Sequence, residues 1–184
     1  LWPLVKRFQA FLFICVMPNS VTRSMQDRLE LHMDLNRVDD NMLREEYLRR
    51  FFILPGKFLG SAKQVADHLS AVFSKVPRDQ EHFAIVLLNQ QHQIIASEIL
   101  FTGSLATSAV YPRELVKRVI QSESAALIIG HTHPSGTVQP SHSDRAITTK
   151  IKNAMDTIDV NLLDHVIIGN GSEEYYSFTD HHLL

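Results

Sequence analysis

Cysteine is almost absent from this 184-residue chain, which contains a single one, Cys15. One thiol excludes an internal disulfide and a zinc site built from several cysteines, and it favours a reducing, cytoplasmic location. Net positive charge is also absent, because 18 Lys and Arg face 20 Asp and Glu, a formal charge of -2. Residues 57–184 carry 10 basic and 13 acidic side chains. This charge balance offers no electrostatic footprint for nucleic acid.

Long apolar runs are missing as well, so no segment is expected to span a membrane. The run in KRFQAFLFICVMP superficially resembles the front of a signal peptide. No small-residue cleavage site follows it, so a buried helix or strand is the expected structure there.

Glycine does not occur in the first 55 residues. Residues 22–54 instead place Leu, Met and Phe at helical spacings between charged residues, which predicts one or two amphipathic helices. The stretch LPGKFLG then interrupts the pattern with Pro and Gly. We therefore expect a helical N-terminal segment over residues 1–56 and a separate domain over residues 57–184.

The second domain alternates short apolar runs with amphipathic segments. A capping box at Ser61 and Gln64 starts a helix, and Pro112 suits the first turn of another. The expected strands are HFAIVLLN and QIIASEILF as a hairpin, then AALIIGHTH, DHVIIG and YYSF; the expected helices after the hairpin are YPRELVKRVIQ and DRAITTKIKNAM. This order predicts an α/β or α+β fold, with helices flanking a mixed β-sheet.

The stretch HTHPSGTVQPSHSD is more polar than a connecting loop requires. His131 and His133 are two residues apart at the end of an expected strand, so their imidazoles should point to the same side. Asp144 is the nearest following carboxylate and lies where a helix begins. Catalytic zinc takes three ligands of these types and keeps one position for water. The pattern therefore predicts a zinc site with an open position.

Metal-activated water also needs a proton acceptor. Glu98 is the candidate, as the one acid within the apolar strand QIIASEILF. Simpler interpretations remain open for each residue: Ser141 and Asp144 also form a capping box, Glu98 could face water on an edge strand, and His-x-His pairs occur in surface loops. The combination of all these residues in one order favours a metal hydrolase.

The motif His-x-His, seven residues, Ser, two residues, Asp resembles the JAMM (MPN+) zinc metalloprotease signature. The segments EILFTGSLATSAVYPRELVKRVIQSESAALIIGHTHPSG, PSHSD, LLDHVIIG and YYSF more closely resemble the RadC family of JAB-type domains. This resemblance covers residues 58–184. It implies a JAB/MPN fold, with cytidine-deaminase-like layering of helices on a sheet, and hydrolysis of a peptide or isopeptide bond.

By this resemblance, His131, His133 and Asp144 are zinc ligands, Glu98 is the acid/base and Ser141 donates to the developing oxyanion. A peptide or protein is the implied substrate. The flanking His142 is expected to be solvated, and Asp164 with His165 to support the structure or the ligands.

Two departures from the RadC pattern bear on function. Thr132 stands where Asn is common between the two histidines, and should point away from the metal. The Gly-containing hairpin of fuller RadC members is not visible in residues 1–55, which weakens the DNA-repair role that the family name suggests. The alternative is a non-catalytic metal-binding or DNA-repair-associated accessory module. A nucleic-acid role would require six basic residues to gather on one face: Arg113, Lys117, Arg118, Arg145, Lys150 and Lys152.

Overall fold

The structure, a computed structural model, describes residues 39–103, 110–169 and 174–184. The chain divides into two units, residues 1–46 and 47–184. Helix α3 (Asp40–Phe51) confirms a helix within the predicted helical stretch, although none of its side chains is buried. The run KRFQAFLFICVMP lies outside the described residues. Across the described ranges, no helix combines the length and apolar character needed to cross a bilayer.

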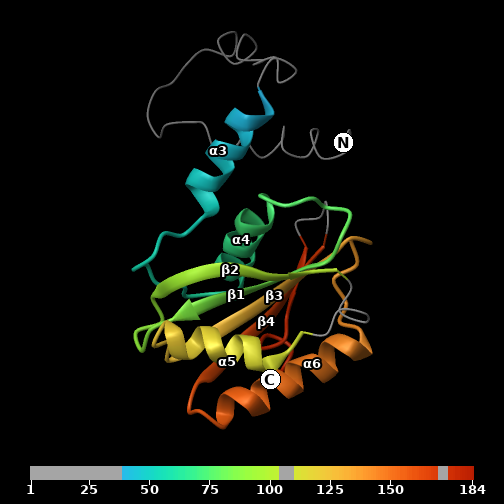
Figure 1. Cartoon of the computed structure of the whole chain (residues 1–184). Coiled ribbons are helices and arrows are strands. Elements are labelled where there is room, and N and C mark those ends of the chain that lie inside the picture. The colour runs from blue at the N-terminus through green and yellow to red at the C-terminus, as the bar shows by residue number, and fades with distance from the viewer. Residues whose placement is uncertain (1–38, 104–109, 170–173) are drawn as a thin grey trace. The chain divides into compact units, whose positions relative to one another are not determined.

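A mixed five-stranded sheet forms the centre of the second unit (Figure 1). Its strands are β1 (His82–Leu88), β2 (Ile94–Thr102), β3 (Ala126–His133), β4 (Asn161–Gly169) and β5 (Tyr175–Ser177). The order across the sheet is β2-β1-β3-β4-β5. Only β3 and β4 run parallel, and β1 is antiparallel to both of its neighbours. The predicted hairpin and the predicted α+β class are therefore confirmed.

Helices cover both faces of this sheet. Helix α4 (Ala62–Phe73) lies on one face, whereas α5 (Pro112–Gln121) and α6 (His142–Asp156) lie on the other (Figure 1). Strand β1 contributes side chains alternately to an apolar core under α4 and to a second core under α5 and α6. Burial on both faces explains why its sequence is continuously apolar rather than alternating.

The helix starts follow the sequence signals. Ser61 caps α4 by accepting a hydrogen bond from the backbone N–H of Gln64, and α5 begins at Pro112. One residue differs from the helical pattern of YPRELVKRVIQ. Ile120 belongs to its apolar stripe but is 62% exposed, whereas Leu115 and Val119 of the same stripe are buried.

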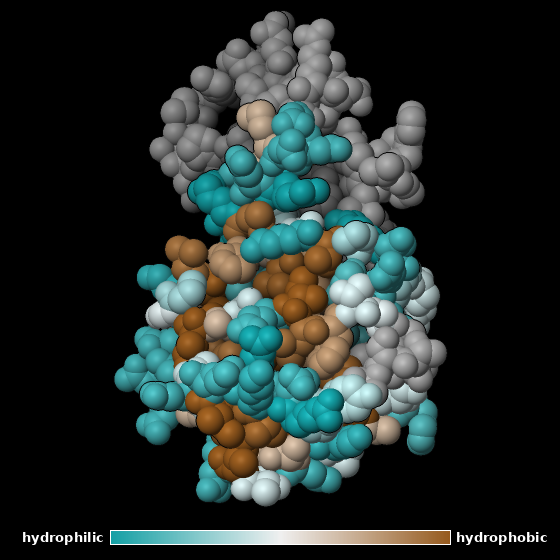
Figure 2. All heavy atoms as spheres, in the orientation of Figure 1, coloured by the Kyte–Doolittle hydropathy of each residue, from teal (hydrophilic) through white to brown (hydrophobic). Residues whose placement is uncertain are grey.

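Strand β2 is an edge strand, and most of its side chains are only partly buried. Figure 2 shows apolar side chains gathered over this part of the molecule. The segment before α4 lies along the start of the strand, since Gly56 N–H donates to Ile94 O and Phe58 forms a bridge with Gln93. The position of β2 at the edge of the sheet agrees with the simpler interpretation of Glu98, in which its side chain faces water.

A buried histidine joins three segments on the α4 face. His68 Nδ1 accepts a hydrogen bond from Ile53 N–H at 2.9 Å, which leaves its Nε2–H to donate to Ser97 Oγ at 2.7 Å. Burial, with a smaller effect of the nearby Lys75 charge, lowers the pKa of His68 from 6.5 to about 4. The folded protein therefore holds His68 neutral, because a proton on Nδ1 would displace the Ile53 N–H.

We expect this histidine to make stability depend on pH. The unfolded chain takes up a proton as pH falls below about 6.5, whereas folded His68 takes it up only near pH 4. Stability from this residue should therefore decline across that window, by roughly 3 kcal/mol, and level off below it. Urea unfolding at several pH values checks this, with His68→Asn as the variant that keeps an acceptor for Ile53. An equally steep decline in parent and variant would refute the assignment.

Candidate metal centre

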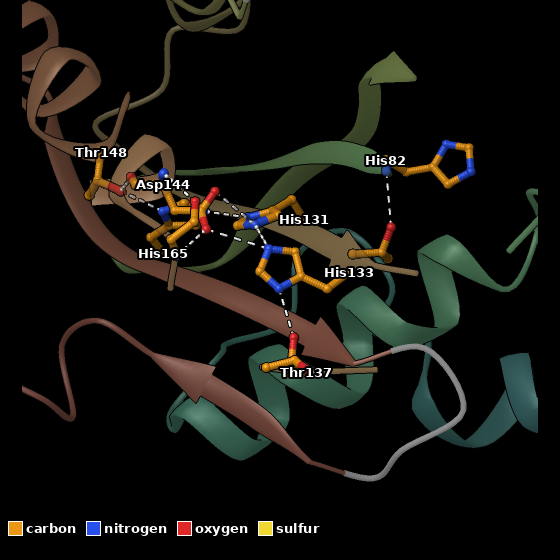
Figure 3. A network of polar contacts seen from close by, with 9 residues as sticks. His82, His131, His133, Thr137, Asp144, Thr148 and His165 are labelled. Atoms are coloured by element: carbon orange, nitrogen blue, oxygen red, sulfur yellow. Dashed lines mark hydrogen bonds and ion pairs between the residues drawn. The ribbon is translucent and has the colours of Figure 1, made fainter. Parts of the chain in front are cut away.

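Three side chains predicted as metal ligands converge at the end of β3 (Figure 3). His131 and His133 come from β3, and their Nε2 atoms are 2.9 Å apart. Asp144, in the first turn of α6, places Oδ1 3.3 Å from His131 Nε2 and Oδ2 3.4 Å from His133 Nε2. One ligand atom from each residue lies within 4.8 Å of the others, a grouping that could hold a metal ion.

The start of α6 positions Asp144. Ser141 N–H donates to Asp144 Oδ2 at 2.7 Å, and Asp144 N–H donates to Ser141 Oγ at 3.1 Å, so the two residues form the predicted capping box. The same carboxylate also faces both histidines. The capping and ligand interpretations of Asp144 are therefore compatible. Ser141 is exposed and its oxygen is the acceptor in the cap, so its hydroxyl proton is left for another acceptor.

The loop between β3 and α6 orients His133. Gly136 turns this loop with φ 81°, and its N–H donates back to His133 O. His133 Nδ1 lies 2.7 Å from Thr137 O, and a carbonyl oxygen can only accept, so Nδ1 carries the proton. In the neutral ring, the lone pair is then on Nε2, which faces His131 and Asp144.

Close contact between this loop and β4 depends on Gly169, which pairs with His133 across the β3–β4 ladder. A Cβ atom at this position would lie 2.5 Å from Gly136 O and 3.0 Å from Val138 Cγ1. The glycine therefore allows the loop to approach closely enough for Thr137 O to meet His133.

Gly169→Ala is expected to push the loop away from β4 and release the Thr137 bond to His133. We expect metal affinity to fall about tenfold, as for loss of a ligand's hydrogen-bond partner. A chelator competition titration with zinc measures this. Gly130→Ala is the matched control, since its Cβ would clash with Leu69 on the opposite face at 2.5 Å. It should cost stability but leave zinc affinity within about threefold. Unchanged affinity in Gly169→Ala would contradict this role for the loop.

The electrostatics of the cluster favour a cation. Burial alone would raise the pKa of Asp144, but its contacts with the His131 and His133 rings, together with the hydrogen bond from Ser141 N–H, outweigh it and hold that pKa well below its usual range. Burial lowers the pKa of His131, while the hydrogen bond to Asp144 raises the pKa of the less buried His133. The centre thus contains a carboxylate anion and one fully buried, neutral imidazole.

Glu98, the predicted proton acceptor, is not one of the three side chains of this cluster. It lies on β2 opposite Ile85 of β1, which in turn lies opposite Ile129 of β3. Two strand spacings separate it from the histidine strand, about 10 Å. Its carboxylate instead forms an ion pair with Arg118 of α5 at 3.2 Å.

Glu81 is an acid near the two histidines that the sequence interpretation did not consider. Strands β1 and β3 are antiparallel with Phe83 opposite His131, so the residue two before Phe83 lies level with His133. Burial lowers the pKa of His131 and the hydrogen bond with Asp144 raises the pKa of His133; the negative charge of Glu81 makes a smaller upward contribution to both, which reflects its proximity to the two rings. The available signal was an acid directly before an apolar strand. That signal points to the histidines only because β1 lies next to β3, and the spacing of the His-x-His motif does not predict the order of the strands.

The other histidines near the motif fall into two groups. His142, at the start of α6, is exposed as expected. His165 of β4 is fully buried, with Nε2 2.8 Å from His131 Nδ1. Asp164 is also buried, and it accepts from the backbone N–H groups of His165 and Thr179. Asp164 therefore supports the structure, and His165 contacts a candidate ligand directly.

Comparison with known proteins agrees with this geometry. Residues 59–183 match the RadC-like JAB domain family. The chain is 47% identical over 111 residues to a UPF0758 protein of Marinomonas sp. (strain MWYL1), covering 60% of this chain and 49% of the relative. It is 43% identical over 125 residues to a UPF0758 protein of Vibrio campbellii (strain ATCC BAA-1116), covering 68% and 54%. The chain spans about half the length of the curated relatives it matches.

The family match begins just before α4 and extends past β5. It therefore includes all five strands of the sheet, the helices on both faces and the cluster at the end of β3. The chain belongs to the RadC-like JAB domain family.

Proposed function

We propose that this protein is a zinc-dependent hydrolase of the JAMM type that cleaves a peptide or isopeptide bond. The observation that carries the proposal is the set of acceptors at the end of β3. His131 Nε2, His133 Nε2 and the Asp144 carboxylate face one another within hydrogen-bonding distances, and the carboxylate is anionic. Three acceptors in such proximity call for a cation, and two imidazoles with one carboxylate suit catalytic zinc.

When bound, zinc would polarise a substrate carbonyl and lower the pKa of a water molecule. Among the described residues, Glu81 lies level with His133 and is the best-placed acid for moving a proton between the attacking water and the leaving amine. The exposed Ser141 hydroxyl could donate to the oxyanion that develops on the carbonyl oxygen. These two roles account for the charges that appear in the transition state.

Zinc content and amide cleavage by the purified full chain test the proposal. Protein prepared without chelators or a nickel column should contain about one zinc per chain. Peptide and isopeptide substrates should be cleaved, and removal of the metal with a chelator should stop cleavage until zinc is restored. Protein that holds no zinc, and whose melting temperature does not respond to added zinc, would favour the non-catalytic accessory module.

The nucleic-acid alternative receives less support from the surface charges. Three of the six basic residues considered for it lie beside carboxylates: Arg113 pairs with Glu114, Arg118 with Glu98 and Lys152 with Asp156. These pairs reduce the positive charge that helices α5 and α6 present to solvent. A salt-dependent DNA-binding titration would reveal such a role if it exists.

A further inference from the structure

His165 lies in the middle of a buried chain of polar contacts behind the metal centre (Figure 3). Its Nε2 is 2.8 Å from His131 Nδ1, and its Nδ1 is 2.6 Å from Thr148 Oγ1. Thr148 Oγ1 in turn lies 2.5 Å from Asp144 O. His131 and His165 are completely buried and Thr148 is 2% exposed, so water does not compete for these bonds.

The last acceptor in this series of contacts, Asp144 O, determines the direction of every hydrogen bond in the series. Asp144 O is a backbone carbonyl and can only accept, so the Thr148 hydroxyl donates its one proton to it. Thr148 Oγ1 must then accept from His165, which places the His165 proton on Nδ1. His165 Nε2 is therefore an acceptor, and it receives the Nδ1–H of His131.

We propose that His165 and Thr148 are positioning residues that hold His131 in the Nδ1–H tautomer, with its Nε2 lone pair directed at the metal position. This inference rests on the proposed function, because it takes His131 as a ligand through Nε2. The opposite tautomer would present an N–H to the metal and could not bind it. We call the series of hydrogen bonds from His131 through His165 and Thr148 to Asp144 O the relay. The relay therefore selects the tautomer of the buried His131 that can bind a metal, without adding a charge.

The surroundings of His165 keep its ring in place for this role. Phe178 stacks on it with ring centroids 4.6 Å apart and an angle of 21°. Phe178 N–H donates to His165 O, while Asp164 accepts from the N–H of His165 and from the Ser177 hydroxyl. The ring is completely buried and its two nitrogens contact His131 and Thr148 rather than a carboxylate, so it stays neutral and keeps one acceptor nitrogen.

Thr148→Val and Thr148→Ser form the matched pair that tests the relay in the full chain. Valine has the shape of threonine but neither donates nor accepts, so His165 loses the partner that keeps its proton on Nδ1. We expect zinc affinity to fall tenfold or more in Thr148→Val. Serine retains the hydroxyl, and Thr148→Ser should bind zinc within about threefold of the parent.

Nitrogen NMR of the imidazole rings in the metal-free protein reads the tautomers directly. The parent and Thr148→Ser should show Nδ1–H on both His131 and His165, and Thr148→Val should shift His131 toward Nε2–H. A merely structural Thr148 would lower the melting temperature of Thr148→Val while leaving the tautomer and zinc affinity unchanged, and that result overturns the proposal. The parent measurement stands even if Thr148→Val does not fold.

The two proposals can fail separately. Nε2–H on His131 in a metal-free parent that binds zinc tightly would overturn the relay and leave the hydrolase standing. Nδ1–H on both histidines in a parent that neither binds zinc nor cleaves amides would overturn the hydrolase and leave the hydrogen-bond relay standing.

Discussion

Replacing His133 by alanine should abolish stoichiometric zinc binding. The change leaves only His131 and Asp144 of the three converging side chains. Two ligands are fewer than the three protein ligands that catalytic zinc requires. His133 is also the least buried of the three, so its removal disturbs the core least. Elemental analysis should therefore show zinc falling from about one per chain to near zero while the far-UV circular dichroism is retained.

His142→Ala is the matched control for this loss. His142 is an exposed histidine at the start of the same helix that bears Asp144. Its removal should leave the zinc content unchanged. If His133→Ala keeps its zinc, or if His142→Ala loses as much, the cluster at the end of β3 is not where the metal binds.

Replacing Glu81 by glutamine should separate metal binding from chemistry. The amide keeps the size of the side chain but cannot accept a proton from water, so we expect kcat/KM for amide cleavage to fall roughly 10²- to 10⁴-fold. The zinc content should stay near one per chain, because Glu81 is not one of the three converging ligands. Steady-state kinetics with elemental analysis on the same preparation measure both quantities.

Glu98→Gln provides the comparison, since Glu98 was the acid that the sequence indicated. Its carboxylate pairs with Arg118 at the partly exposed edge of the sheet, and an ion pair of this kind contributes at most about 1 kcal/mol. We expect activity within about threefold of the parent. A large loss of activity in Glu98→Gln with none in Glu81→Gln would return the acid/base role to Glu98 and refute the assignment of Glu81.

The convergence of His131, His133 and Asp144 was predictable because their positions depend on local structure. Two histidines two residues apart on a strand must point to the same side, and a helix start after a short Pro- and Gly-containing loop can return Asp144 to them. The capping box at Ser141 was readable for the same reason, since it joins residues only three apart. Spacing along the chain was therefore sufficient for each of these side chains.

Glu98 illustrates where such inference stops. An acid in an apolar strand does need a partner, and in the structure the carboxylate of Glu98 pairs with Arg118 of α5. Which strand lies beside the histidine strand is decided by the sheet order, and β1 rather than β2 occupies that place. The acid that the β1–β3 pairing brings level with His133 is Glu81, directly before β1, a position that no spacing rule singled out.

The sequence by itself determined the α+β class, the helix starts and the three converging side chains, because periodicity, capping and strand alternation act over a few residues. Only the tertiary structure decided which acid meets the histidines and how His131 is oriented. Glu81 reaches them through the β1–β3 pairing, and His165 through the parallel pairing of β4 with β3. Such proximities join residues far apart in the sequence, such as His131 and His165, which are 34 positions apart and in contact. They depend on the order of the strands, which packing of the whole sheet sets and local patterns do not carry.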